Sequence, residues 1–183
     1  MKSVTIHEHT FKIKITSAEI NKAVGKVAQR INYQLKGRKP LFLAVLNGSF
    51  MFASDLMKKI KIDCEISFVK VSSYEGTSTT GNIKQLIGLN EDITGRTIII
   101  IEDIVDTGTT IENVFEQLEA LGAADIKVAT LLFKPEAYTK NVPIDYVAIT
   151  VPNDFLVGYG LDYNGLGRNL KDIYVVDYQI ENK

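Results

Sequence analysis

Apolar segments of strand length alternate with amphipathic stretches along most of the chain. The clearest segments are Leu41–Leu46, residues 97–101 and Asp125–Phe133. Apolar runs of this length, rich in β-branched residues, are typical of strands buried on both faces of a sheet. Between them, apolar residues recur every three or four positions, which predicts helices. Alternating strands and helices predict an α/β fold with a mainly parallel central sheet flanked by helices.

Three helices are expected from the polar and apolar spacing. Thr16 and Glu19 have the spacing of a capping box, and Gly37 is a plausible C-terminal stop for the helix that follows them. A short helix is expected over about residues 50–60, and another from residue 110 to about 121. Further strands are predicted at residues 11–15, 65–71, 83–89, 145–150, 156–161 and 173–177.

Residues 72–82 interrupt this pattern. They are Ser, Thr, Gly and Asn almost throughout, with one aromatic residue, Tyr74, and one acid, Glu75. Long polar loops in compact domains are usually functional or disordered, so a flexible lid and a surface loop without a role both stay open. The segment after Asn141 is expected to form a small lobe beside the sheet. No repeat or linker divides the chain, and we expect a single domain over residues 1–183.

Composition and charge exclude several classes of protein. The 183 residues are 45% hydrophobic and 23% charged, which is ordinary for a globular protein and unlike a disordered or fibrous one. With 21 basic and 22 acidic residues, the net charge of −1 predicts no nucleic-acid partner. A single cysteine, Cys64, allows no internal disulfide. No apolar run approaches the ~18 residues that a membrane span needs, and no signal peptide is visible, so we expect a cytoplasmic protein without a membrane partner.

The stretch from Ile98 to Thr110 carries the most chemical information. Four isoleucines are followed by Glu102 and Asp103, where the strand is expected to end at the open edge of the sheet. Ligands of open α/β sheets bind beyond the carboxyl ends of the strands. Asp106 then leads into a small turn that begins a helix and consists of Thr107, Gly108, Thr109 and Thr110.

That turn suits an anion. Its hydroxyls, the close backbone approach that Gly108 permits and the unpaired N–H groups of a first helical turn all favour a phosphate. Glu102 and Asp103 would repel a phosphate, so they must serve another part of the ligand, either neighbouring ribose hydroxyls or a metal. A phosphate turn beside such acids describes a ribose 5-phosphate site. A surface acidic pair before a capped helix is the alternative, which the length of the unbroken block makes less favoured.

Residues 98–110 resemble the phosphoribosyl-pyrophosphate signature of the type I phosphoribosyltransferases. The chain is similar to the branch of that family that acts on 6-oxopurines from about Leu41 to Asp177. Matching segments are residues 46–49, 73–74, 133–135, 151–162 and 168–170. The resemblance implies the family fold with a small hood lobe and a flexible lid loop. It also implies transfer of ribose 5-phosphate from phosphoribosyl pyrophosphate to hypoxanthine or guanine, with release of pyrophosphate.

The resemblance implies a role for each acid. Asp106 lies near N7 of the purine as the candidate general base, and it joins Thr107, Gly108, Thr109 and Thr110 around the 5′-phosphate. Glu102 and Asp103 contact the ribose hydroxyls, directly or through Mg²⁺, the cofactor that the reaction implies. Asp162 binds a second Mg²⁺. From the sequence alone, Asp162 is equally a turn residue at the end of a strand.

The resemblance also implies contacts for the purine and the pyrophosphate. Lys134 donates to the purine 6-oxo group, Phe155 stacks on the base and Leu156 offers backbone groups. A solvated lysine and a core phenylalanine are the alternatives for the first two. The expected pyrophosphate contacts are Leu46, Asn47, Gly48, Ser73, Tyr74 and Arg168. Many relatives have a lysine where Asn47 stands, so contact there would come mainly from the backbone.

Regulation of genes is the alternative class of function for this scaffold. Some proteins on this scaffold sense nucleotides and regulate genes by binding RNA or DNA, which requires a basic face or an added domain. A net charge of −1 in one domain provides neither. We therefore expect an enzyme that acts on small molecules and, as is usual in the family, forms a homodimer or homotetramer. The sequence leaves open whether xanthine is also accepted.

Overall fold

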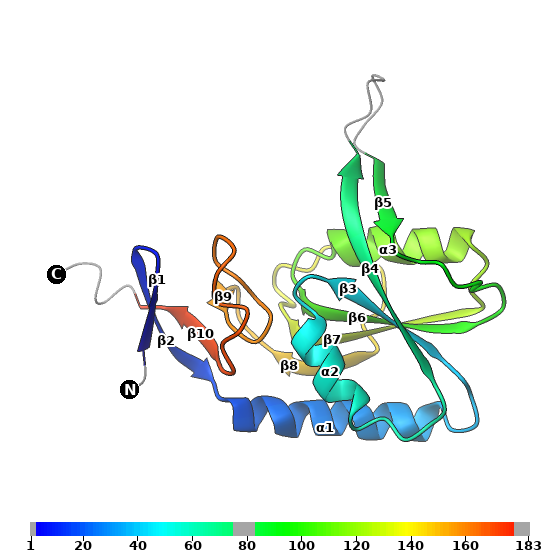
Figure 1. Cartoon of the computed structure of the whole chain (residues 1–183), viewed down its shortest axis with the longest axis horizontal. Coiled ribbons are helices and arrows are strands. Elements are labelled where there is room, and N and C mark those ends of the chain that lie inside the picture. The colour runs from blue at the N-terminus through cyan, green and yellow to red at the C-terminus, as the bar shows by residue number, and fades with distance from the viewer. Residues whose placement is uncertain (1–2, 75–82, 178–183) are drawn as a thin grey trace.

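Two sheets form the framework of the protein in the computed structural model, which describes residues 3–74 and 83–177 (Figure 1). The central sheet has the strand order β5-β4-β3-β6-β7-β8. Five of these strands run parallel, and β5 pairs antiparallel with β4 at one edge. The strands are β3 (Leu41–Leu46), β4 (Glu65–Tyr74), β5 (Ile83–Ile87), β6 (Thr97–Val105), β7 (Asp125–Phe133) and β8 (Tyr146–Thr150). The mainly parallel sheet confirms the predicted fold class.

Helices cover both faces of the central sheet. One core unites β3 and β6 with α1 (Ser17–Gln34) and α2 (Phe50–Met57), and it takes Ile99 and Ile101 from β6. The other core lies under α3 (Thr109–Ala120) and takes Ile98 and Ile100. Because successive side chains of a strand point to opposite faces, the isoleucine run fills both cores, as a strand buried on both sides requires.

The capping box at the start of α1 is confirmed. The Glu19 N–H donates to Thr16 Oγ1 at 3.4 Å, and the Thr16 N–H donates to Glu19 Oε2 at 2.8 Å. Two N–H groups of the first turn, which the helix itself leaves unpaired, thereby find acceptors. The helix ends at Gln34, and Gly37 follows in a left-handed conformation with a φ of 79°. None of the three helices within the described residues combines the length and apolar character that a bilayer crossing demands.

A second sheet lies beside the first and draws on both ends of the chain (Figure 1). Its order is β1-β2-β10-β9, and all its pairs are antiparallel. The strands are β1 (Ser3–Ile6), β2 (His9–Ile15), β9 (Leu156–Val157) and β10 (Ile173–Val176). The tail after Asn141, expected to form a lobe beside the sheet, supplies β9 and β10 of this second sheet. β8, which also belongs to that tail, pairs instead with β7 in the central sheet, and the N-terminal hairpin supplies the other two strands of the second sheet.

Two strand boundaries differ from the prediction for clear reasons. β6 continues to Val105, because Glu102 and Val105 still pair with β7, so the acids lie within the last part of the strand. β9 ends at Val157, because Gly158, Tyr159 and Gly160 all have positive φ. Residues 75–82, most of the predicted lid, lie outside the described residues, so the lid stays a prediction.

Candidate active site

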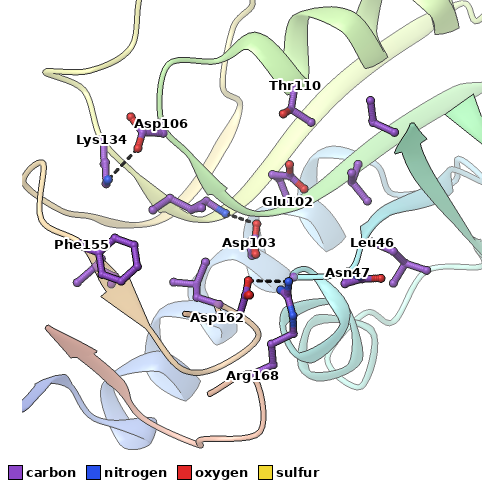
Figure 2. A pocket seen from close by; sticks show the side chains of 16 residues that line it. Leu46, Asn47, Glu102, Asp103, Asp106, Thr110, Lys134, Phe155, Asp162 and Arg168 are labelled. Carbon is purple, nitrogen blue, oxygen red and sulfur yellow. Dashed lines mark hydrogen bonds and ion pairs between the residues drawn. The ribbon is translucent and has the colours of Figure 1, made fainter. Parts of the chain in front are cut away.

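A cavity of about 460 Å³ opens at the carboxyl ends of β3, β6 and β7, facing the second sheet (Figure 2). The chain segments that meet there are far apart in the sequence. The predicted site residues that line it are Leu46, Asn47, Gly48, Glu102, Asp103, Asp106, Thr110, Lys134, Phe155, Leu156, Asp162 and Arg168. A second cavity of about 310 Å³ shares Glu102, Asp103, Asp106 and Thr110 and adds Thr107, Gly108 and Thr109. The side chains of Ser73 and Tyr74 lie outside the described part of the chain.

Two buried carboxyl groups lie at the end of β6. Glu102 is 7% exposed, and burial together with the neighbouring Asp103 raises its pKa well above the usual range. Burial raises the pKa of Asp103 to about 6, although the N–H of Ile104, which donates to Asp103 at 2.8 Å, opposes the shift. Charged oxygens in a low-dielectric site are costly unless they meet hydroxyl donors or cations. The pair is therefore suited to hold a polar ligand rather than to stabilise the fold.

Asp103→Asn is expected to stabilise the protein at neutral pH while it removes a ligand contact. The folded pKa of about 6 lies above the usual aspartate value of 3.8, so an ionised Asp103 costs stability above pH 6. That cost disappears as the pH falls from about 6 to about 4, because the folded state then binds the proton. We expect the free energy of unfolding of the variant at pH 7.5 to exceed that of the unmodified chain by about 1–3 kcal/mol.

Denaturant unfolding at pH 7.5 and at pH 4 measures this difference, with the unmodified chain as reference. The gain should be present at the higher pH and nearly absent at the lower. Equal stability of the two proteins at pH 7.5 would show that the ionised Asp103 does not lower the stability of the folded state.

The turn between β6 and α3 is shaped by Gly108. This residue caps α3 with a φ of 88°, and a Cβ there would overlap the Tyr138 ring. The Thr107 and Thr109 hydroxyls lie 3.2 Å apart, and the Thr139 N–H donates to the Thr107 carbonyl at 3.3 Å. The first-turn N–H groups of α3 are thus presented beside a pair of hydroxyls, which is the arrangement that binds a phosphate.

Gly108→Ala is expected to distort this turn. The methyl group meets Tyr138, and alanine disfavours positive φ, so we expect a loss of about 1–3 kcal/mol of stability and weaker binding of a 5′-phosphate. Gly25→Ala is the matched control, since Gly25 lies inside α1 with nothing within 4 Å of an added Cβ. Unfolding midpoints and the KM for phosphoribosyl pyrophosphate measure both effects. A Gly108 variant as stable as the Gly25 variant would contradict this account of the turn.

Lys134 and Asp106 form an ion pair at the cavity wall (Figure 2). Lys134 Nζ donates to Asp106 Oδ2 at 2.8 Å and to Asn153 Oδ1 at 3.3 Å. The lysine side chain is only 9% exposed, whereas that of Asp106 is 45% exposed. A buried ammonium with acceptors on the protein side can present its remaining donor to a ligand. No role is predicted for Asn153 from the sequence, because nothing local to it points to a lysine 19 residues away.

Gly48, Asp162 and Arg168 meet on the opposite wall. Arg168 Nη2 pairs with Asp162 Oδ1 at 2.6 Å, as Figure 2 shows, and Arg168 Nη1 donates to the Gly160 carbonyl at 2.7 Å. A Cβ at Gly48 would overlap the Asp103 carboxyl oxygen, so this backbone reaches the buried acids closely. The Leu46–Asn47 peptide bond is cis. The wall therefore combines the Gly48 backbone, a guanidinium group and a carboxylate.

Phe155 presents its ring to the same cavity. The side chain is 48% exposed, and its ring packs against Phe11 and Tyr163 with centroids 6.5 and 5.7 Å away. This exposure argues against the core interpretation that the sequence left open. Leu156 is buried in β9. Four apolar lining residues are not predictable from the sequence, because only the fold shows which core residues reach the cavity: Val45, Val71, Ile104 and Leu161.

The cavity brings together a phosphate turn, two buried acids and a buried lysine. Comparison with known proteins shows to which family a chain with this site belongs. Residues 15–164 match the family model of the phosphoribosyl transferase domain. The chain belongs to the type I phosphoribosyltransferase family. Among curated phosphoribosyltransferases, it is 39% identical to the hypoxanthine-guanine enzyme of Streptococcus pneumoniae strain R6 over 172 residues, which cover 92% of this chain and 94% of that protein. It is 37% identical to the hypoxanthine phosphoribosyltransferase of Escherichia coli K12 over 166 residues, 89% and 93% of the two chains.

Solved phosphoribosyltransferase structures share the fold. The crystal structure of a hypoxanthine phosphoribosyltransferase from Staphylococcus aureus matches with a TM-score of 0.84 and 33% identity, and the match covers 92% of each chain. A hypoxanthine phosphoribosyltransferase from Trypanosoma cruzi, a mutant in a ternary substrates complex, matches with a TM-score of 0.83 and 34% identity over 93% of this chain and 97% of that one. The similarity therefore extends over both sheets of this phosphoribosyltransferase and not only over its phosphate turn.

Proposed function

We propose that residues 1–183 form a single phosphoribosyltransferase domain that salvages purines. It transfers ribose 5-phosphate from phosphoribosyl pyrophosphate to hypoxanthine or guanine and releases pyrophosphate with IMP or GMP. The observation that carries this proposal is the Lys134–Asp106 pair, which lies on the same cavity as the buried acids and Thr110 of the phosphate turn. The relatives named hypoxanthine-guanine and hypoxanthine phosphoribosyltransferase support the same substrates.

Different residues around the cavity bind different parts of the substrate. The turn from Thr107 to Thr110 holds the 5′-phosphate, while Glu102 and Asp103 accept hydrogen bonds from the ribose hydroxyls. As the bond from the sugar to pyrophosphate breaks, positive charge develops on the ribose ring. The buried acids stabilise that charge, and exclusion of water from the cavity protects it. Fixing both reactants in one cavity supplies much of the rate enhancement.

Lys134 and Asp106 select the purine. The lysine Nζ donates to the 6-oxo group, and the Asp106 carboxylate accepts the N7 proton. The two residues that already pair with each other thereby both bind the same edge of the base. The 6-amino group of adenine is itself a hydrogen-bond donor, so it would face the lysine ammonium without an acceptor between them. Phe155, with its half-exposed ring, covers one face of the base, and Leu156 offers its backbone. On the opposite wall Leu46, Asn47, Gly48 and Arg168 hold the pyrophosphate.

The donor set on this cavity fits Mg²⁺. Glu102, Asp103 and Asp162 offer only carboxylate oxygens, which this hard cation prefers, and the desolvated Asp103 carboxyl would be relieved by a positive charge. In the described part of the chain no three acidic, histidine or cysteine side chains converge into a ready metal site. Mg²⁺ usually takes few protein ligands and several from phosphates and water, and when bound it neutralises the charge on the leaving pyrophosphate.

Large apolar side chains are exposed on α2 and β4. Phe50, Ile66 and Phe68 are 41%, 38% and 44% exposed. Exposed apolar side chains are common at protein contacts, which supports our prediction of a homodimer or homotetramer. We also retain the predictions of a cytoplasmic location and of no nucleic-acid or membrane partner.

The direct test is incubation of the protein with phosphoribosyl pyrophosphate, Mg²⁺ and each purine base, with the nucleotide and the pyrophosphate both measured. Hypoxanthine and guanine should yield IMP and GMP, adenine should yield little AMP, and the result with xanthine defines the specificity at the purine 2-position. Omission of Mg²⁺ should abolish turnover. Formation of no nucleotide from either 6-oxopurine would overturn the proposal.

A further inference from the structure

Residues 158–160 form an unusual turn after β9. Gly158, Tyr159 and Gly160 have φ values of 101°, 49° and 102° in succession. Glycine adopts this conformation readily, whereas a bulky residue such as tyrosine does so only where its surroundings impose it. Strained residues of this kind concentrate at functional sites and persist only where surrounding contacts hold them. Specific contacts are therefore expected to hold Tyr159.

The side chain of Tyr159 is anchored to a helix. It is 3% exposed, and its hydroxyl donates to Asp55 Oδ2 of α2 at 2.6 Å. Lys58 Nζ donates to the other oxygen of Asp55 at 2.8 Å, so the acceptor carboxylate is itself held in place. Burial and the bond to Asp55 raise the pKa of Tyr159, which keeps the hydroxyl protonated and able to donate. The Tyr159 N–H donates to the Leu170 carbonyl at 2.7 Å.

The next residue connects this anchor to the wall of the cavity. Gly160 touches the Gly48 carbonyl so closely that a Cβ would overlap it. The Gly160 N–H donates to the Arg168 carbonyl at 2.9 Å, and the Gly160 carbonyl accepts from Arg168 Nη1 at 2.7 Å. Gly48 in turn lies against the Asp103 carboxyl group. Tyr159 itself is not among the residues that line the cavity, and its polar connection to the cavity runs through Gly160 to Gly48 and Arg168.

We propose that Tyr159 is a positioning residue for the pyrophosphate. Its bond to Asp55 fixes the turn of residues 158–160 between α2 and the cavity, and the turn holds the Gly48 backbone and the Arg168 guanidinium in the arrangement that receives the leaving group. This inference rests on the proposed role of Gly48 and Arg168 at the pyrophosphate. Within the described residues, no hydrogen bond joins Tyr159 to Lys134 or Phe155 on the purine wall.

The arrangement predicts a selective kinetic effect. Tyr159→Phe removes one hydroxyl and keeps the ring. Because a hydrogen bond to a charged acceptor is lost, we expect the KM for phosphoribosyl pyrophosphate, and for pyrophosphate in the reverse reaction, to rise about 3- to 10-fold. The KM for hypoxanthine should change by less than about two-fold, because its contacts are elsewhere. A residue with only a structural role would lower the amount of active protein and leave every KM unchanged.

Tyr146→Phe is the matched control. Tyr146 is a buried tyrosine of β8, 1% exposed, whose hydroxyl has no hydrogen-bond partner in the described structure. This variant should keep every KM. The proposal is overturned if Tyr159→Phe leaves the KM for pyrophosphate within about two-fold of the unmodified value, or raises the KM for hypoxanthine by the same factor. Circular dichroism spectra and unfolding midpoints confirm that the compared proteins are folded.

Asp55→Ala gives an independent route to the same question. It should raise the KM for pyrophosphate as Tyr159→Phe does, and the double variant should be no worse than either single one, because both changes remove the same Tyr159–Asp55 bond. Lys58→Ala, which leaves the Tyr159–Asp55 bond in place, should change the KM little. Independent, multiplying effects of the two changes would overturn the proposal.

Arg168→Ala separates failure of this inference from failure of the proposed site. If Arg168→Ala raises the KM for pyrophosphate while Tyr159→Phe does not, the pyrophosphate wall stands and the positioning role falls. If Arg168→Ala also leaves that KM unchanged, both the pyrophosphate wall and the role of Tyr159 are wrong.

Discussion

Asp106→Asn is expected to lower kcat for IMP and GMP formation by about 10²–10⁴-fold, the range in which general acid–base groups contribute. Asparagine keeps the shape of the side chain and an oxygen that can accept from Lys134 Nζ. In the unmodified protein this Nζ lies 2.8 Å from Asp106 Oδ2. It loses the negative charge that receives the N7 proton of the purine. Because Asp106 is 45% exposed, the substitution should leave the unfolding midpoint nearly unchanged.

Steady-state kinetics with both bases measure this effect. Asp125→Asn is the control, since Asp125 is also an ion-paired acid, with Arg38 at 3.0 Å, but it lies at the start of β7 and away from the cavity. The control should retain full turnover. Unchanged turnover in the Asp106 variant would remove this residue from the mechanism and leave proton transfer to solvent.

Lys134→Gln is expected to weaken the discrimination against adenine. A site that matches the hydrogen bonds of its substrate can reject a mismatched analogue by about 10⁴–10⁵-fold. Glutamine offers both a donor and an acceptor, so its oxygen can meet the 6-amino group of adenine while its amide still reaches Asp106 or Asn153. We expect the preference for hypoxanthine over adenine, as a ratio of kcat/KM values, to fall by about 10²-fold or more.

The ratio of kcat/KM for the two bases is the decisive measurement. Lys127→Gln provides the comparison, because Lys127 lies on β7, the strand that ends directly before Lys134, and it also pairs with acids, Asp125 at 3.4 Å and Asp145 at 3.7 Å, but not at the cavity. A Lys134 variant with an unaltered base preference would place selectivity in the backbone around Leu156 instead.

Local signals in the sequence predicted much of the fold. The capping box at Thr16 and Glu19 and the strand Leu41–Leu46 depend on neighbouring residues, and the structure has both. The turn from Thr107 to Thr110 is likewise local and begins α3 within a few residues of its expected start. These elements were predictable because one segment of chain contains the capping atoms, the apolar face and the turn residues that define them.

Other features depend on contacts between distant segments. β1 is a short strand that exists because it pairs with β2, and β2 pairs in turn with β10 near the other end of the chain. The bond of Asn153 to Lys134 and that of Tyr159 to Asp55 join residues 19 and 104 positions apart. No periodicity or spacing encodes such pairs, so the roles of Asn153 and Tyr159 emerged only from the structure.

The order of strands in the second sheet has a consequence for synthesis of the protein. β10 lies between β2 and β9 and joins them, because those two strands do not pair with each other in the described structure. The central sheet, its phosphate turn and the Lys134–Asp106 pair are complete in the sequence by Thr150, but β10, which pairs with β9 directly after Phe155, is translated only with Ile173–Val176. A ribosome-bound chain that has just exposed β8 should therefore hold the phosphate turn and the lysine that selects the base, and it acquires the Phe155 ring and the Arg168 guanidinium last.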